Sequence, residues 1–246
     1  TMYKKIKINN GTETLRVISD AGKFNRWMYE TIKPFCNGQI LEIGSGIGNI
    51  SRFLLTDGYR VTLSDIDRSY IETVEKRFSG FDNLDEVIHF DFAEKEINKK
   101  HSRIIGQFDT IVALNVLEHI DDHKQAVSNC LQLLKPDGKL VILVPAFEAL
   151  FNEFDKAVEH KRRYSVRSLK EVMSISGFNI IHTQYFNVAG ILGWYVSGKI
   201  FKKKVIPGGQ MSVYNKLVPL WRVADRLMGR ICGLSLICVA KKTAPD

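Results

Sequence analysis

The sequence predicts an α/β protein built on a doubly wound parallel sheet. Short apolar segments that end in glycine or a carboxylate alternate with segments of helical periodicity between residues 39 and 186. This alternation is typical of a parallel sheet with helices on both faces. With 246 residues and 45% hydrophobic side chains, the chain can form one substantial core. One large domain, or one domain with a cap, is therefore expected.

The first 146 residues carry most of this pattern. The segment "QILEIGS" is apolar, short and ended by glycine, as a buried strand is. In the helix that follows, Ile50, Phe53 and Leu54 share one face, and Gly58 lies near the end. The predicted strands are 39–45, 59–67, 87–94, 108–120 and 139–146, and the predicted helices are 48–58, 68–80 and 123–138, the last closing on Pro-Asp-Gly.

The second half is less regular. A helix is predicted over 165–178, with Ser165 at its N-cap, and a strand over 179–186. About 45 residues separate this strand from the last one, predicted at 234–242, and we interpret them as a helical cap or a dimerisation element. Their apolar stretch, 187–204, is broken by glycines and shorter than the roughly 20 residues that a membrane-spanning helix needs.

Charge is distributed unevenly along the chain. Residues 1–150 have 19 Lys and Arg against 21 Asp and Glu, whereas residues 151–246 have 16 against 6. This excess favours an anionic partner, such as a phosphorylated substrate, a membrane surface or nucleic acid; a basic surface without a specific partner is the alternative. The four cysteines form no C-x-x-C pair and no apolar signal segment is visible, which favours a cytoplasmic protein.

A glycine-rich turn follows the first strand. The stretch "ILEIGSGIG" places Gly44, Gly46 and Gly48 between a strand and a helix, where glycine lets the backbone approach a ligand closely. The spacing differs from the G-x-G-x-x-G of dinucleotide-binding proteins, and no P-loop lysine follows. Glu42 precedes the turn, and an acid there suits a ligand with positive charge or hydrogen-bond donors better than a phosphate.

Acids also end the next two predicted strands. Asp65 follows the second strand, where an acid accepts hydrogen bonds from the ribose hydroxyls of a nucleoside in doubly wound folds. Asp91 follows the third strand and is suited to accept from an adenine amino group, with Phe92 beside the ring. Each acid alone is more typical of a loop or a helix cap. Together with Glu42 they mark the edge where open α/β sheets bind ligands.

This set of motifs resembles that of the class I S-adenosylmethionine-dependent methyltransferases. "LEIGSGIGN" is similar to the family's E-x-G-x-G-x-G motif, "LSDID" to its ribose-binding acid and "HFDFAE" to its adenine-binding acid; "FDTIVALNVLEHIDDH" and "LLKPDGKLVILVP" are similar to its fourth and fifth strand segments. The resemblance covers about residues 38–146. It implies a Rossmann-like sheet of seven strands whose last strand is antiparallel, with S-adenosylmethionine as cofactor and S-adenosylhomocysteine as product.

The resemblance also implies roles for single residues. Gly44 and Gly46 approach the cofactor, and Glu42 orders the loop near the methionine amino group. The implied cofactor-binding residues are Glu42, Gly44, Ser45, Gly46, Gly48, Asp65, Ile66, Asp91, Phe92, Asn115 and Leu117. The domain that they define spans 38–185 plus 233–243, after a helical lead-in at 1–37 and interrupted by the cap at 186–232.

Beyond the cofactor motifs, two segments bear on the acceptor. "VPAFEALFNEFDKAVEHKRRYS" and "GLSLICVAKK" resemble bacterial and archaeal methyltransferases associated with glycan and polyprenyl-lipid biosynthesis. Methyl transfer to a hydroxyl benefits from a base that titrates near neutrality, and the candidates are His119 and His160. Arg162 and Arg163, with Tyr164, are candidates for binding a phosphate or carboxylate on the acceptor. Packing histidines and a solvated basic turn are the alternatives.

A candidate metal site is formed by Glu118 and His119, together with Asn115. One carboxylate, one imidazole and an amide make a weak site for a hard cation, so no metal is expected, and Mg²⁺ is the ion that such a site would take.

The cap is expected to receive an amphiphilic or anionic acceptor, in peripheral contact with the inner face of a membrane. Lysines follow apolar residues in "GILGWYVSGKIFKKK", and Arg222, Arg226 and Arg230 recur every four residues. Packing of its apolar face on the sheet or in a homodimer is the alternative.

Other functions are less favoured by the sequence. A nucleic-acid partner is disfavoured because neither an N-P-P-Y-type motif nor an aromatic RNA-binding module is found. A nucleic-acid or protein methyltransferase is kept as the alternative. The glycine spacing disfavours a nicotinamide oxidoreductase. A non-catalytic S-adenosylmethionine-binding scaffold stays open. We therefore predict an S-adenosylmethionine-dependent methyltransferase that acts on a hydroxyl of a small-molecule, glycan or lipid-linked acceptor.

Overall fold

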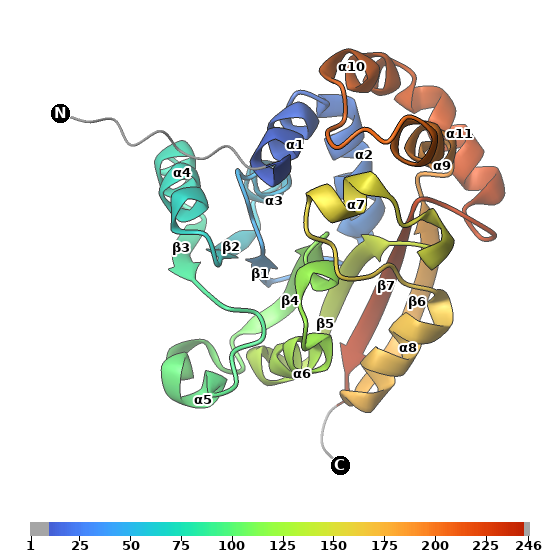
Figure 1. Ribbon diagram of the computed structural model, residues 1–246. Coiled ribbons are helices and arrows are strands. Elements are labelled where there is room, and N and C mark those ends of the chain that lie inside the picture. The colour runs from blue at the N-terminus through green and yellow to red at the C-terminus, as the bar shows by residue number, and fades with distance from the viewer. Residues whose placement is uncertain (1–9, 244–246) are drawn as a thin grey trace.

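A computed structural model describes residues 10–243 and shows one sheet of seven strands in the order β3-β2-β1-β4-β5-β7-β6 (Figure 1). The strands are β1 (Gln39–Ile43), β2 (Arg60–Asp65), β3 (Leu84–His89), β4 (Phe108–Leu114), β5 (Leu134–Pro145), β6 (Phe178–Phe186) and β7 (Ser235–Lys242). β1 to β5 pair in parallel, whereas β7 runs antiparallel to both β5 and β6. The predicted seven-stranded, mostly parallel sheet with an antiparallel last strand is confirmed.

Helices cover both faces of the sheet. They are α1 (Asn10–Ser19), α2 (Gly22–Ile32), α3 (Ser51–Thr56), α4 (Arg68–Phe78), α5 (Ile97–Lys100), α6 (His123–Leu133), α7 (Glu153–Ala157), α8 (Val166–Ile175), α9 (Gly190–Trp194), α10 (Gly208–Lys216) and α11 (Val218–Met228). Apolar side chains of α5, α6 and α8 form a core with one face of the sheet, and those of α2, α3 and α4 form a second core with the other face. Each central strand is buried on both sides, as its nearly continuous apolar sequence requires.

The order of the strands determines which edge of the sheet is suited to bind a ligand. The chain adds β2 and β3 on one side of β1, then returns to place β4 and β5 on the other side. The carboxyl ends of β1 and β4 therefore lie together at the point where the direction of winding changes. In open α/β sheets this is the crevice that binds ligands.

The predicted strands at β3 and β4 extend well past the observed ones. β4 ends at Leu114 rather than at residue 120, because Asn115 adopts a positive φ of 54° and a 3₁₀ turn (Leu117–His119) follows. β3 ends at His89 rather than at residue 94, since the chain then turns, and the Asp91 carboxylate accepts the backbone N–H of Ala93 at 2.9 Å. In both cases a local turn competes with the extended pattern and prevails.

The segment between β6 and β7 is helical and contains α9, α10 and α11. It packs against α2, with Met211 and Val218 in the same core as α2 residues such as Trp27 (Figure 1). Among residues 10–243, none of the helices combines the length and the apolar character needed to cross a bilayer.

Candidate functional site

The turn between β1 and α3 is held by the strand beside it. The backbone N–H groups of Gly44 and Ser45 both donate to the carbonyl oxygen of Ser64, at 2.8 and 3.0 Å. Gly44 has a φ of 72°, and a Cβ there would lie 2.4 Å from a methyl group of Val116. Only glycine allows this approach between the carboxyl ends of β1 and β4.

The other two predicted glycines differ in their surroundings. Gly46 is buried, and its backbone N–H donates to the Asp65 carboxylate at 2.9 Å. Gly48 has a φ of 81°, and a Cβ there would lie 2.4 Å from the Phe78 ring. Its need for glycine is explained by packing on α4, so a direct cofactor contact is not required to account for it.

Asp65 links the turn to the end of β2. Its second oxygen accepts the N–H of Asp67 at 2.9 Å, and the residue is 8% exposed. Burial raises the pKa of this carboxyl, while the hydrogen bonds from Asp67 and Gly46 oppose the rise. The side chain is thus fixed at the sheet edge, and a carboxylate oxygen has lone pairs for further donors such as ribose hydroxyls. Ile66, next to it, is exposed over 61% of its surface.

Glu42 is a buried acid without a full set of partners. It is 5% exposed, and its Oε2 has no hydrogen-bond partner among residues 10–243; the same holds for the buried hydroxyl of Ser45. Burial, together with the nearby Asp65 carboxylate, raises the pKa of Glu42 to about 7. An unpartnered buried carboxylate is costly unless a donor or a cation compensates it. These atoms fit the ammonium end of S-adenosylmethionine, as the sequence predicts.

Two of the predicted cofactor-binding residues, Phe92 and Leu117, have buried side chains. Phe92 is 3% exposed and Leu117 is fully buried, and both belong to the core on the α6 face. Their side chains therefore have little or no surface with which to contact adenine or the methyl donor. Asn115, in contrast, is exposed at the end of β4, and Asp91 is half-buried after β3, so both are placed where a ligand can reach them.

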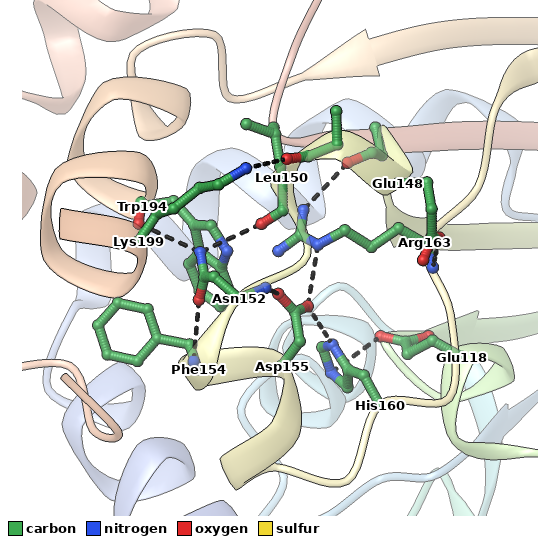
Figure 2. A network of polar contacts seen from close by, with 12 residues as sticks. Glu118, Glu148, Leu150, Asn152, Phe154, Asp155, His160, Arg163, Trp194 and Lys199 are labelled. Carbon is green, nitrogen blue, oxygen red and sulfur yellow. Dashed lines mark hydrogen bonds and ion pairs between the residues drawn. The ribbon is translucent and has the colours of Figure 1, made fainter. Parts of the chain in front are cut away.

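A second cluster of polar side chains follows β5 (Figure 2). The His160 Nδ1–H donates to the Asp155 carboxylate at 2.8 Å, and His160 Nε2 lies 3.7 Å from Glu118 Oε1. Burial alone would raise the pKa of Asp155, but the hydrogen bond from His160 and the Arg163 guanidinium hold it below its usual value. Asp155 therefore stays ionised, fixes the Nδ1–H tautomer of His160 and leaves Nε2 as a base.

Glu118 faces this histidine from the 3₁₀ turn after β4. It is fully buried, and neither of its carboxylate oxygens has a hydrogen-bond partner among residues 10–243. Burial raises the pKa of Glu118 to about 7. An imidazolium at His160 would be stabilised by this carboxylate as well as by Asp155.

His119 stands beside His160 with the two ring centroids 4.7 Å apart. Burial and the charge of His160 lower the pKa of His119 to about 4, so its imidazole is neutral and weakly basic near pH 7. A neutral, weakly basic imidazole is poorly suited to the general-base role predicted for His119. Ligand atoms of Glu118, His119 and His160 lie within 4.8 Å of one another, a spacing that could hold a metal ion. His160 is the third member of this group.

The basic turn predicted to bind the acceptor is largely internal. Arg163 is 5% exposed; its Nε donates to Asp155 at 2.9 Å, and its Nη1 donates to the Ala146 carbonyl at 3.0 Å. Tyr164 is 1% exposed, and its hydroxyl bonds to His123 Nδ1 at 2.8 Å. Both side chains thus bond to partners inside the protein, which leaves them little surface for an acceptor. Arg162 is half-buried and remains accessible.

Asp155 was absent from the predicted site, although it makes the central contacts of the cluster. It closes a capping box on α7: the Asn152 side chain accepts the N–H of Phe154, and Asp155 accepts the N–H of Asn152. The N-x-x-D spacing in "FNEFDKA" is the signal from which this acid could have been found. Its approach to His160 depends on the length and bend of α7, which the sequence pattern does not specify.

Comparison with known proteins identifies the domain family and supports the fold. The sequence profile described as a methyltransferase domain matches residues 23–183. The chain is 23% identical over 114 residues to the ubiquinone biosynthesis O-methyltransferase of Erwinia tasmaniensis, and this match covers 46% of the chain and 45% of that enzyme. It is 29% identical over 143 residues to the probable polyketide synthase 41 of Dictyostelium discoideum, covering 50% of the chain and 6% of that protein. The chain thus spans less than half the length of these curated relatives.

Solved structures share the architecture at low sequence identity. The phosphoethanolamine N-methyltransferase 2 of Haemonchus contortus, in complex with S-adenosyl-L-methionine, aligns with a TM-score of 0.61 and 17% identity, over 98% of this chain and 59% of that one. At this identity the likeness establishes the fold alone. Because the domain profile covers well over half of the residues, this chain belongs to the methyltransferase domain family, with the fold of the class I S-adenosylmethionine-dependent methyltransferases.

Proposed function

We propose that the protein transfers the methyl group of S-adenosylmethionine to a hydroxyl of a small, amphiphilic acceptor, and that His160 is the general base. Glu42, the turn at Gly44–Gly46 and Asp65 are the residues that would hold the cofactor. When bound, the cofactor supplies a methyl group activated by a sulfonium. Everything else in the reaction falls to the protein: aligning the nucleophile, removing its proton and excluding water.

The observation that carries the proposal is the Asp155–His160–Glu118 arrangement at the sheet edge. Asp155 holds the Nδ1–H of His160, so that Nε2 accepts the hydroxyl proton as the oxygen attacks the methyl carbon. The imidazolium that forms lies between two carboxylates, Asp155 at 2.8 Å and Glu118 at 3.7 Å. Their charge stabilises the protonated base while the reaction proceeds in a site with little exposure to water.

The test separates binding from chemistry. In His160→Gln we expect S-adenosylmethionine binding, measured by calorimetry, to stay within about twofold of the wild type, because His160 is separate from the turn that would bind the cofactor. The rate of S-adenosylhomocysteine release with a panel of phenolic, glycan and polyprenyl-linked acceptors should fall at least about 100-fold, because a general base typically accelerates the reaction by at least this factor. Equal turnover of the wild type and His160→Gln would exclude this role. Cofactor binding without turnover on any acceptor would support a scaffold instead.

The acceptor class is inferred from the cap. The segment 187–231 contains eight Lys and Arg but one acid, together with most of the large apolar side chains that the described residues expose. A hydrophobic acceptor with an anionic group matches this composition. We extend the proposal to peripheral association with the cytoplasmic face of a membrane, where such an acceptor would be found.

A further inference from the structure

Helix α11 presents an apolar face to solvent. Leu220, Val223 and Leu227 are between 52% and 77% exposed, and Ile231, which follows the helix, is 72% exposed. The spacing of Leu220, Val223 and Leu227 by three and four residues places them along one side of the helix. Figure 1 shows α11 at the periphery of the molecule, beside α10. Single exposed apolar residues are common, but a continuous row of them marks a surface that contacts something else.

The rotation of α11 is fixed by contacts on its opposite side. Val218 is 3% exposed and belongs to the core shared with α2. The Asp225 carboxylate accepts the N–H groups of Asn187 and Val188, at 2.6 and 2.7 Å. The apolar row therefore cannot turn inward without breaking these contacts, so it is a stable feature of the surface.

Basic side chains flank the row. A hollow of about 330 Å³ between α2 and α11 is lined by four of them together with apolar residues: Lys23, Arg26, Arg222, Arg226, Val218, Pro219 and Val223. Arg222 is paired with Glu30 at 2.5 Å, whereas Lys23 and Arg226 are exposed, with no ion pair within residues 10–243. Arg230, in the turn after α11, is also exposed.

From this juxtaposition we infer that α11 docks on an anionic phospholipid bilayer. The row Leu220, Val223, Leu227 and Ile231 enters the interface, and the hollow at Lys23, Arg26 and Arg226 takes lipid phosphates. Charge complementarity selects this occupant over a second copy, because a symmetric contact through α11 would bring the same arginines of two subunits together. An anionic surface attracts each of them instead.

The inference gives a surface to the amphiphilic acceptor of the proposed function, but its test does not depend on turnover. The full chain is sedimented with vesicles of phosphatidylcholine alone or mixed with phosphatidylglycerol, without cofactor or acceptor. We expect binding to the mixed vesicles that weakens as salt rises, and little binding to phosphatidylcholine. Leu227→Ser should weaken the partition at least about tenfold, as expected for removing a leucine from the apolar interface. Arg226→Glu should weaken it at least about fivefold, the contribution of one basic residue near an anionic membrane.

Matched controls lie on α8, where Ile175 is 60% exposed and Arg167 is also exposed. Ile175→Ser and Arg167→Glu change the same chemistry elsewhere and should bind like the wild type. Failure of the wild type to bind mixed vesicles, or equal losses in the α8 and α11 variants, would overturn the inference. A concentration-dependent dimer that Leu227→Ser dissociates would also overturn it and assign the surface to a second copy. Calorimetry with S-adenosylmethionine on the same variants keeps these outcomes distinct from failure of the proposed function.

Discussion

Replacement of Glu42 by glutamine should make the protein more stable and its cofactor binding weaker. Burial raises the pKa of Glu42 from 4.5 to about 7, so the folded state holds a proton that the unfolded state loses as pH rises from 4.5 to 7. The free energy of unfolding therefore falls as the pH rises from 4.5 to 7, and it stays at the lower value above pH 7. At 1.36 kcal/mol per pH unit, the loss is about 3 kcal/mol. Glutamine does not ionise, so Glu42→Gln avoids this loss at pH 8.

Urea unfolding of the ligand-free wild type and variant at pH 5 and pH 8 measures the effect. We expect the variant to be more stable by up to about 3 kcal/mol at pH 8 and nearly equal to the wild type at pH 5. Calorimetry at pH 8 should show S-adenosylmethionine binding weakened about 10- to 100-fold, since a hydrogen bond to a charged group contributes about 1.5–3 kcal/mol. A variant that is less stable at pH 8, or that binds the cofactor as the wild type does, would refute the reasoning.

Three further predictions follow from the same geometry. Asp65→Ala should weaken S-adenosylmethionine binding at least about tenfold, and it should lower the free energy of unfolding by about 1–3 kcal/mol because the buried N–H of Gly46 loses its acceptor. Calorimetry and urea unfolding measure the two effects, and unchanged affinity would remove Asp65 from the ligand site. Gly48→Ala should destabilise the fold by about 2 kcal/mol or more, because alanine is strained at this positive φ and its Cβ would overlap the Phe78 ring. Gly80→Ala is the control, since a Cβ added there has no atom within 4 Å, and equal urea midpoints for the two variants would contradict the packing account. Dialysis against EDTA should leave turnover unchanged, as no metal is expected; a loss restored by Mg²⁺ would place an ion at Glu118, His119 and His160 and remove the general-base role.

The fold could be predicted because local and global signals agree along the chain. Apolar strands ended by glycine or acid determine the parallel half of the sheet, and β1 and β2 lie close to where their sequences place them, whereas β5 begins at Leu134, inside the segment predicted as the end of a helix. The limits of β3 and β4 could not be read from hydrophobicity, since Asp91 and Asn115 end them through local turns while apolar residues continue beyond.

The site could be predicted only in part, for a different reason. Sequence motifs specify which residues stand at strand ends, and the placement of Glu42, Gly46 and Asp65 follows from that. They do not specify which polar side chains pair with one another. Arg163 has the chemistry of an anion-binding group, yet the chain folds it onto Asp155, where it is 5% exposed.

The central claim is that the glycine turn and the Asp155–His160 pair belong to one methyl-transfer site. A crystal structure of the full chain with S-adenosylhomocysteine tests it most directly. We predict the ribose hydroxyls on Asp65, the amino group near Glu42 and the sulfur facing the space in front of His160 Nε2. A ligand bound elsewhere, or a sulfur that points away from His160, would contradict the account.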